Sequence, residues 1–293
     1  MLKLFIVFFS GIVSALAALT YKFRHRHGFS IDVLLLYFSL FFTLFTLLCI
    51  FIFREPLFTP RALFLGLCSG LIMGTVIRFM FIVTYRAKLN ISWTVIQYSV
   101  LIPFLLSLVL FREKPQLKAL LGAGCIFVSI LFFGLGKSKA QDGPSKHDVK
   151  TGLLMFLCSF LTGIMFSIPK LYLYLEPRGG TFTLLLYSGV GMIPLASFVL
   201  FVKKNSKTVL WAAPGLLVLA LYMGITNVGA IALLMIALQS IEGSIVFPLR
   251  TVVNVLSIFL LTFILFREKP SFLEAVGVLI ALTGLVLVIM TMR

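Results

Sequence analysis

The chain has 293 residues, of which 61% are hydrophobic and only 12% are charged, and its formal net charge is +16. Soluble proteins carry about 25% charged residues, so this chain has too few polar residues to coat a soluble fold, and we expect an all-α integral membrane protein with many spans. Its 25 Lys and Arg residues are spread over nearly every short connection, which is typical of loops that meet lipid head groups and argues against nucleic acid as a partner.

The apolar runs, taken in chain order, are long enough for ten helices that each cross a bilayer, which needs about 20 mostly apolar residues. The predicted spans are 3–21, 32–53, 62–85, 91–111, 116–136, 150–174, 181–202, 209–236, 242–265 and 272–291. The first run has the basic start and A-L-A ending of a signal peptide, but we expect it to stay as a span because the repeat described below includes it. The longest connection, 137–149, is polar and contains Gly and Pro, so we expect a linker between two five-helix halves, 1–136 and 150–293.

The two halves share a sequence repeat. FLLSLVLFREKP at 104–115 aligns with FLLTFILFREKP at 259–270, with nine of twelve positions identical, and SGI at 10–12 matches TGI at 162–164. The alternative is that this segment merely suits the end of a membrane helix, and FREP at 53–56, which ends the second predicted span, supports it. The identities that flank the segment favour an internal duplication. Five crossings separate equivalent points, so the second half is expected to be inverted relative to the first. Inverted repeats are typical of transporters that work by alternating access.

Ten helices in two inverted halves, with a Glu-containing exit after the fourth and ninth helices, resemble the ten-helix branch of the drug/metabolite transporter superfamily. The residues that carry the resemblance are Pro103, 105–115, 256–270, Gly277 and Gly284. That superfamily usually has Gly immediately before the Glu, where this chain has Arg112 and Arg267. The resemblance implies a transporter but no particular substrate, since members export amino acids and other metabolites, exchange sugar phosphates or nucleotide sugars, or handle lipids.

Arg250 is expected to lie deep in the ninth span, eight residues or about 12 Å from Glu242. An ionisable side chain at that depth is costly and is therefore a functional candidate by default. Asn254 follows one helical turn later on the same face, and Pro248 weakens the helix beside them. We expect Arg250 and Asn254 to form a binding surface, with a purely structural pairing of the arginine as the alternative.

Arg78 is expected to lie equally deep in the third span, eight residues before Arg86. It follows the glycines at 66, 70 and 74, a ridge that lets a neighbouring helix approach closely, so it should point into the bundle. The depth of Arg78 is counted from one membrane face and that of Arg250 from the opposite face. Both side chains are therefore expected to reach one central cavity. Arginine suits phosphate and carboxylate groups. The alternative for Arg78 is again a structural pair.

Acidic residues and histidines all lie in loops or near the ends of the predicted spans. A cavity with two arginines and no buried acid is expected to prefer an anionic or zwitterionic solute to a cationic drug. The four cysteines have no metal-ligand spacing, so we expect no metal site. We also expect no cofactor and, because no His–Asp pair and no acidic cluster is evident, no catalytic residue. Lys170 is close enough to a helix end to snorkel. Weaker candidates for the polar lining are Trp93, Gln97, Tyr98, Tyr222, Asn227, Gln239, Tyr37, Thr226 and Tyr187.

These patterns favour a secondary transporter, acting as exporter, uniporter or exchanger, for a phosphorylated compound, organic acid or amino acid. The alternatives are a flippase for phospholipids or lipid-linked molecules and, with less support, a membrane-embedded transferase, because no nucleophile–base pair is evident. The expected partners are a small-molecule substrate and the lipid bilayer of a bacterial cytoplasmic membrane. The protein is expected to be a monomer or a homodimer, and both states stay open. Loop charges favour termini outside the cell, whereas the superfamily resemblance favours termini in the cytoplasm, and both orientations stay open.

Overall fold

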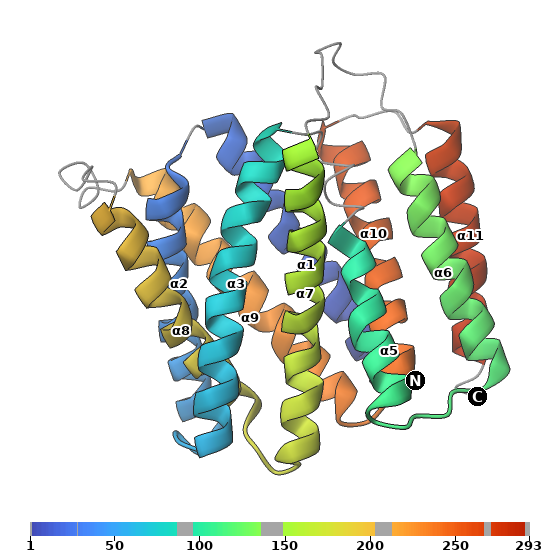
Figure 1. Cartoon of the computed structure of the whole chain (residues 1–293), viewed down its shortest axis with the longest axis horizontal. Helices are drawn as coiled ribbons and strands as arrows, with labels where there is room; N and C mark the ends of the chain where they lie inside the picture. The colour runs from blue at the N-terminus through green and yellow to red at the C-terminus, as the bar shows by residue number, and fades with distance from the viewer. Residues whose placement is uncertain are drawn as a thin grey trace.

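The computed structural model describes residues 2–27, 29–86, 96–135, 149–202, 213–266 and 271–290. Within these ranges, all regular secondary structure is helical, and the helices lie side by side in one bundle with both chain ends on the same side (Figure 1). The helices are α1 (Leu2–His27), α2 (Ile31–Phe53), α3 (Pro60–Arg86), η1 (Tyr98–Val100), α5 (Leu101–Val109), α6 (Leu117–Leu135), α7 (Val149–Leu175), α8 (Thr181–Val202), α9 (Pro214–Leu238), α10 (Gly243–Phe266) and α11 (Phe272–Met290). The predicted all-α class is confirmed.

Eight helices of the described ranges are long and apolar enough to cross a membrane, and two shorter apolar helices, Tyr98–Val109 and Leu117–Phe132, accompany them. Large apolar side chains cover the outside of the bundle, as with Phe201 at 84% and Phe272 at 82% exposure. Lipid tails remove such surfaces from water, so the chain is a multi-pass integral membrane protein. The arrangement as ten spans in two inverted repeats stays a prediction.

Glycines bring several helix pairs into backbone contact. The predicted ridge on α3 packs against α8, where a Cβ added at Gly70 would lie only 2.9 Å from the Cα of Gly191. On α6, a Cβ at Gly122 would lie 2.8 Å from the carbonyl oxygen of Gly284 on α11. Small residues allow this close approach, which supplies packing energy that the hydrophobic effect cannot supply between helices in lipid.

Two carboxylates from exit segments cap helices of the second half. Glu55, after α2, accepts hydrogen bonds from the backbone N–H groups of 181–183, at 3.1, 2.7 and 3.2 Å, at the start of α8. Glu113, after α5, does the same at the start of α10. The residue before each carboxylate, Arg54 or Arg112, has a left-handed backbone with φ of 55° or 51°. Glycine adopts that conformation without strain, which fits the glycine that the resembled superfamily usually has at the position of Arg112.

Candidate binding cavity

A cavity lies in the middle of the bundle between α1, α3, α7, α9 and α10 and the segment 96–99, so both halves of the chain line it. The space between these segments, open solvent included, is about 800 Å³. Its lining residues on α1 (14–21) and α3 (73–80) lie from the middle of these helices toward the side away from the chain ends, whereas those on α7 (162–166), α9 (227–231) and α10 (250–254) lie from the middle toward the chain ends. The cavity therefore occupies the middle of the bundle.

Arg250 on α10 lies at this cavity with only 6% of its surface exposed. Its Nε donates a hydrogen bond to the Ser10 hydroxyl at 3.0 Å, and that hydroxyl donates to the carbonyl of Ala230 at 2.8 Å. The guanidinium carbon lies 4.8 Å from the centre of the Phe166 ring, a favourable cation–π distance. None of these partners is an anion, and no carboxylate pairs with Arg250 in the part of the chain that the structure describes. The site therefore holds a buried positive charge that is only partly compensated.

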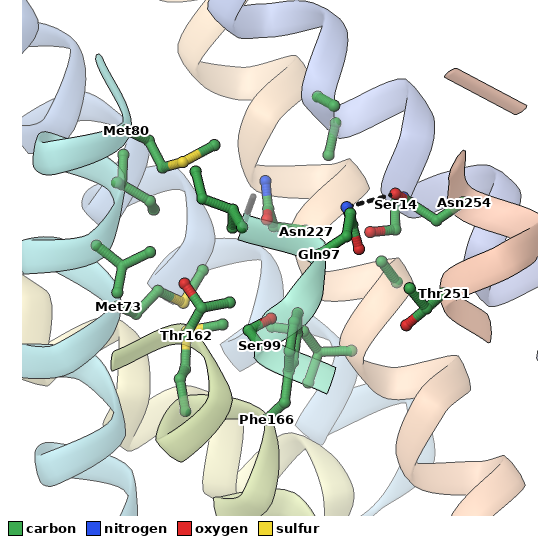
Figure 2. A pocket seen from close by; sticks show the side chains of 18 of the residues that line it. Ser14, Met73, Met80, Gln97, Ser99, Thr162, Phe166, Asn227, Thr251 and Asn254 are labelled. Atoms are coloured by element: carbon green, nitrogen blue, oxygen red, sulfur yellow. Dashed lines mark hydrogen bonds between the residues drawn. The ribbon is translucent and has the colours of Figure 1, made fainter. Parts of the chain in front are cut away.

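Asn254 lies one turn beyond Arg250 and is 3% exposed. Its Oδ1 accepts a hydrogen bond from Nε2 of Gln97 at 2.9 Å, and its Nδ2 donates to the carbonyl of Gly11 at 3.4 Å. Figure 2 shows this amide pair beside Ser14, with Thr251 close by. The pair joins α10 to the segment that leads into η1, so it connects the two halves at the cavity wall.

The opposite wall of the cavity is apolar. Met73, Val76, Ile77 and Met80 all come from one face of α3, because positions i, i+3, i+4 and i+7 share a helix face. Figure 2 shows Met73 and Met80 across the cavity from Gln97 and Asn254. Asn227 on α9 lies between the two walls, and its Nδ2 donates to the carbonyl of Met223 at 2.8 Å. The cavity is thus polar at one end and apolar at the other.

Arg78 does not line this cavity, contrary to our expectation. Its guanidinium lies 3.5 Å from the carboxylate of Asp32 near the start of α2, and the two side chains are 24% and 8% exposed. Depth in the bilayer alone predicts equal roles for both arginines. The difference is a carboxylate on a neighbouring helix, which Arg78 reaches and Arg250 does not.

Four further candidates do not line the cavity either. The Tyr222 hydroxyl donates to the carbonyl of Leu16 at 3.0 Å, and the Tyr37 ring stacks on Phe41. The Tyr98 hydroxyl is buried and has no hydrogen-bond partner among the described residues. Gln239 follows the last residue of α9 and lines a separate surface pocket with Lys170 and Arg178.

Thr226 and Tyr187 also lie away from the cavity. The Thr226 hydroxyl donates to the carbonyl of Tyr222 at 2.7 Å, and the Tyr187 hydroxyl donates to that of Leu57 at 3.1 Å. Trp93 lies outside the described residues. Of the predicted lining, the structure therefore brings together Arg250, Asn254, Gln97 and Asn227.

Ser10 and Phe166, the two direct partners of Arg250, were not among the predicted site residues. Ser10 begins the SGI segment, whose match to TGI at 162–164 indicated a duplication, and Thr162 of that second segment lines the cavity. The predicted repeat therefore contained one partner of Arg250 and one lining residue without revealing the role of either. Phe166 is one of 31 phenylalanines, and nothing in the sequence distinguishes it from the others.

On the side of the chain ends, three charged contacts join the two halves. Glu113 pairs with Nζ of Lys170 at 2.5 Å and accepts from the backbone N–H groups of Gly243 and Ser244 at 3.0 and 2.8 Å. We call these four residues the Glu113 clamp. Burial favours a raised pKa for Glu113, but the hydrogen bonds from Lys170, Ser244 and Gly243, with the Lys170 charge, hold its pKa below the ordinary value. The Glu55 cap of α8 and an ion pair of Arg61 with Glu176 at 2.9 Å lie on the same side.

Comparison with known proteins finds a family match in the second part of the chain. Residues 150–290 match the model of the EamA-like transporter family, and this range lies within the predicted second half. A solved structure, described only as the crystal structure of a protein, is similar over 98% of this chain and 98% of its own length, with a TM-score of 0.75 and 14% sequence identity. This similarity indicates a shared fold. No curated protein matches the chain. Over residues 150–290, slightly less than half of its length, the chain is therefore similar to the EamA-like transporter family of the drug/metabolite transporter superfamily.

Proposed function

We propose that this protein is a secondary transporter that moves a small anionic or zwitterionic metabolite through the central cavity by alternating access. The observation that carries this proposal is Arg250. It is a buried cation at a cavity between the two halves, and its described partners are a hydroxyl and an aromatic ring. A buried charge without an opposite charge is costly, so an anionic group of a solute is the natural partner.

Helix packing supports two related halves that a two-fold rotation would superimpose on each other. If α1, α2 and α3 correspond to α7, α8 and α9, the packing of α3 on α8 corresponds to that of α9 on α2, and both pairs are present. Likewise, α1 packs on α9 and α7 packs on α3. Gly11 faces α10 at Val253, while its repeat equivalent Gly163 faces Ser99 and Ile102, on the segment that corresponds to α10.

The position of the charged contacts supports a cavity with one closed side. The Glu113 clamp, the Glu55 cap and the Arg61–Glu176 pair all join the first half to the second on the side of the chain ends. The cavity lies deeper in the bundle than these contacts. In this proposal, the contacts hold one end shut while the other admits solute, and they separate when the transporter changes state.

Counterflow in proteoliposomes tests the proposal. We expect at least one anionic or zwitterionic metabolite to exchange across the membrane, and Arg250→Gln to reduce this exchange at least tenfold. Arg178→Gln, which removes the same charge from an exposed loop residue, should leave the exchange unchanged. If organic acids, phosphorylated compounds and amino acids all fail to exchange, or if Arg250→Gln exchanges as well as the wild type, the proposal is wrong.

A further inference from the structure

Building on the proposed function, we propose that the cavity takes an amphipathic organic monocarboxylate, with its carboxylate on Arg250, its apolar body on the α3 wall, and no ammonium group. The first reason is charge. Among the described lining residues, Arg250 is the only side chain that is charged at neutral pH. One positive charge compensates one carboxylate, whereas a phosphate dianion would bring an extra buried charge with no partner, and such charges are costly.

The second reason is the absence of an anion for an ammonium group. Every polar lining residue in the described ranges other than Arg250 is a neutral hydroxyl, phenol or amide, as with Thr162, Ser99 and Asn227. The ring of Phe166, which could face a cation, already lies against the Arg250 guanidinium. The segment 87–95, which leads into the lining residue Ile96, contains no Asp or Glu in its sequence. An amino acid would therefore bring an ammonium group for which the described lining offers no carboxylate.

The third reason is the separation of polar and apolar walls. The guanidinium uses its Nε for Ser10, which leaves its two terminal NH₂ groups for the bidentate geometry that carboxylates prefer. Across the cavity, Met73, Val76, Ile77 and Met80 offer only hydrocarbon and thioether groups. Methionine side chains adapt to irregular apolar partners. A carboxylate with a hydrocarbon body fills both ends, while a small hydrophilic acid leaves the apolar wall uncovered.

The test is a matched series of probes on purified, reconstituted wild-type protein, read by thermal stabilisation and by counterflow. The aromatic probes are 4-phenylbutyrate, phenylalanine, 4-phenylbutanamide and phenyl phosphate at a pH where it is a dianion. We expect 4-phenylbutyrate to bind and exchange, and the other three to bind at least tenfold more weakly. In straight-chain carboxylates from butanoate to octanoate, affinity should rise about fourfold per methylene until the wall is covered.

Two variants separate the polar and apolar ends of the site. Arg250→Gln should weaken all carboxylates at least tenfold and leave the neutral amide unchanged, whereas the control Arg178→Gln should change neither. Met73→Gln, of similar size, should flatten the dependence on chain length while it preserves the affinity for butanoate. Equal loss of butanoate and octanoate in Met73→Gln would overturn the assignment of the apolar wall.

The outcomes distinguish this inference from the proposed function. If phenylalanine or phenyl phosphate binds more tightly than 4-phenylbutyrate and depends on Arg250, the monocarboxylate inference is overturned and the transporter proposal stands. If the wild-type protein exchanges amino acids or phosphorylated compounds but no monocarboxylate, the same conclusion follows. If no anion binds or exchanges at all, both proposals fail.

Discussion

Replacing Glu113 with glutamine should weaken the closure on the side of the chain ends. The carboxylate pairs with Lys170 and accepts the N–H groups of Gly243 and Ser244, and the Glu113 and Lys170 side chains are only 10% and 14% exposed. Removing one partner of a buried pair costs about 3–5 kcal/mol. Because glutamine still accepts a backbone hydrogen bond, we expect a loss near 3 kcal/mol, which is roughly a hundredfold change in an equilibrium between two states.

Spin labels at two exposed positions beside the clamp, Leu110 after α5 and Leu175 at the end of α7, measure this change in a background without native cysteines. Glu113→Gln should add a population with a longer distance between the labels. The double variant Glu113→Gln/Lys170→Gln should lose less stability than the sum of its single variants, since the unpaired lysine charge is also gone. Identical distance distributions and melting temperatures in wild type and Glu113→Gln would refute the role of the clamp.

Acid should reproduce the effect of Glu113→Gln. The pKa of Glu113 is lowered from 4.5 in the folded protein, so its contribution to stability is complete above that value and is lost as the pH falls through the lowered pKa. The labelled wild-type protein should therefore gain the longer distance only below about pH 4.5, whereas Glu113→Gln should show no such dependence. A transition at neutral pH would have to come from another group.

Three further predictions concern stability, measured by thermal unfolding in detergent. Glu55→Gln should cost about 1–2 kcal/mol because it removes the charge that caps α8, and an unchanged melting temperature would contradict that cap. Gly70→Ala should cost about 1–3 kcal/mol through overpacking against α8, whereas Gly124→Ala, with nothing within 4 Å of the added Cβ, should be neutral or stabilising; equal effects would argue against close packing. Arg112→Gly should keep or raise stability, by up to about 1 kcal/mol, and Arg112→Val should lower it, because valine is disfavoured in a left-handed backbone. The reverse order would refute the observed backbone conformation.

The sequence was sufficient to predict the all-α membrane class, because apolar run length reports directly on bilayer thickness. It also predicted Arg250 and Asn254 at the cavity, since depth and the spacing of four fix both position and face. It was not sufficient for Arg78, because the role of that side chain depends on Asp32, and helix adjacency between distant segments leaves no mark in one sequence.

The tyrosine candidates failed for a related reason. Depth in a span does not decide which way a side chain points, and the hydroxyl of Tyr222 finds a backbone carbonyl of α1 instead of the cavity. The repeated FREKP segment was interpreted as a membrane exit. Its first copy also supplies the Glu113 clamp, a role that only the neighbouring helix start reveals, while the second copy lies largely outside the described residues.

The caps made by Glu55 and Glu113 bear on how the protein is made. Both carboxylates are synthesised with the first half, yet their backbone partners are at the starts of α8 and α10, which emerge from the ribosome much later. The early chain must therefore keep two acidic groups in contact with head groups or water until those helices insert. Assembly can finish only after α10 enters the bilayer. A fragment ending at 136 would lack the backbone N–H groups that Glu55 and Glu113 bind. Residues 150–293, supplied as a separate chain, would provide these groups.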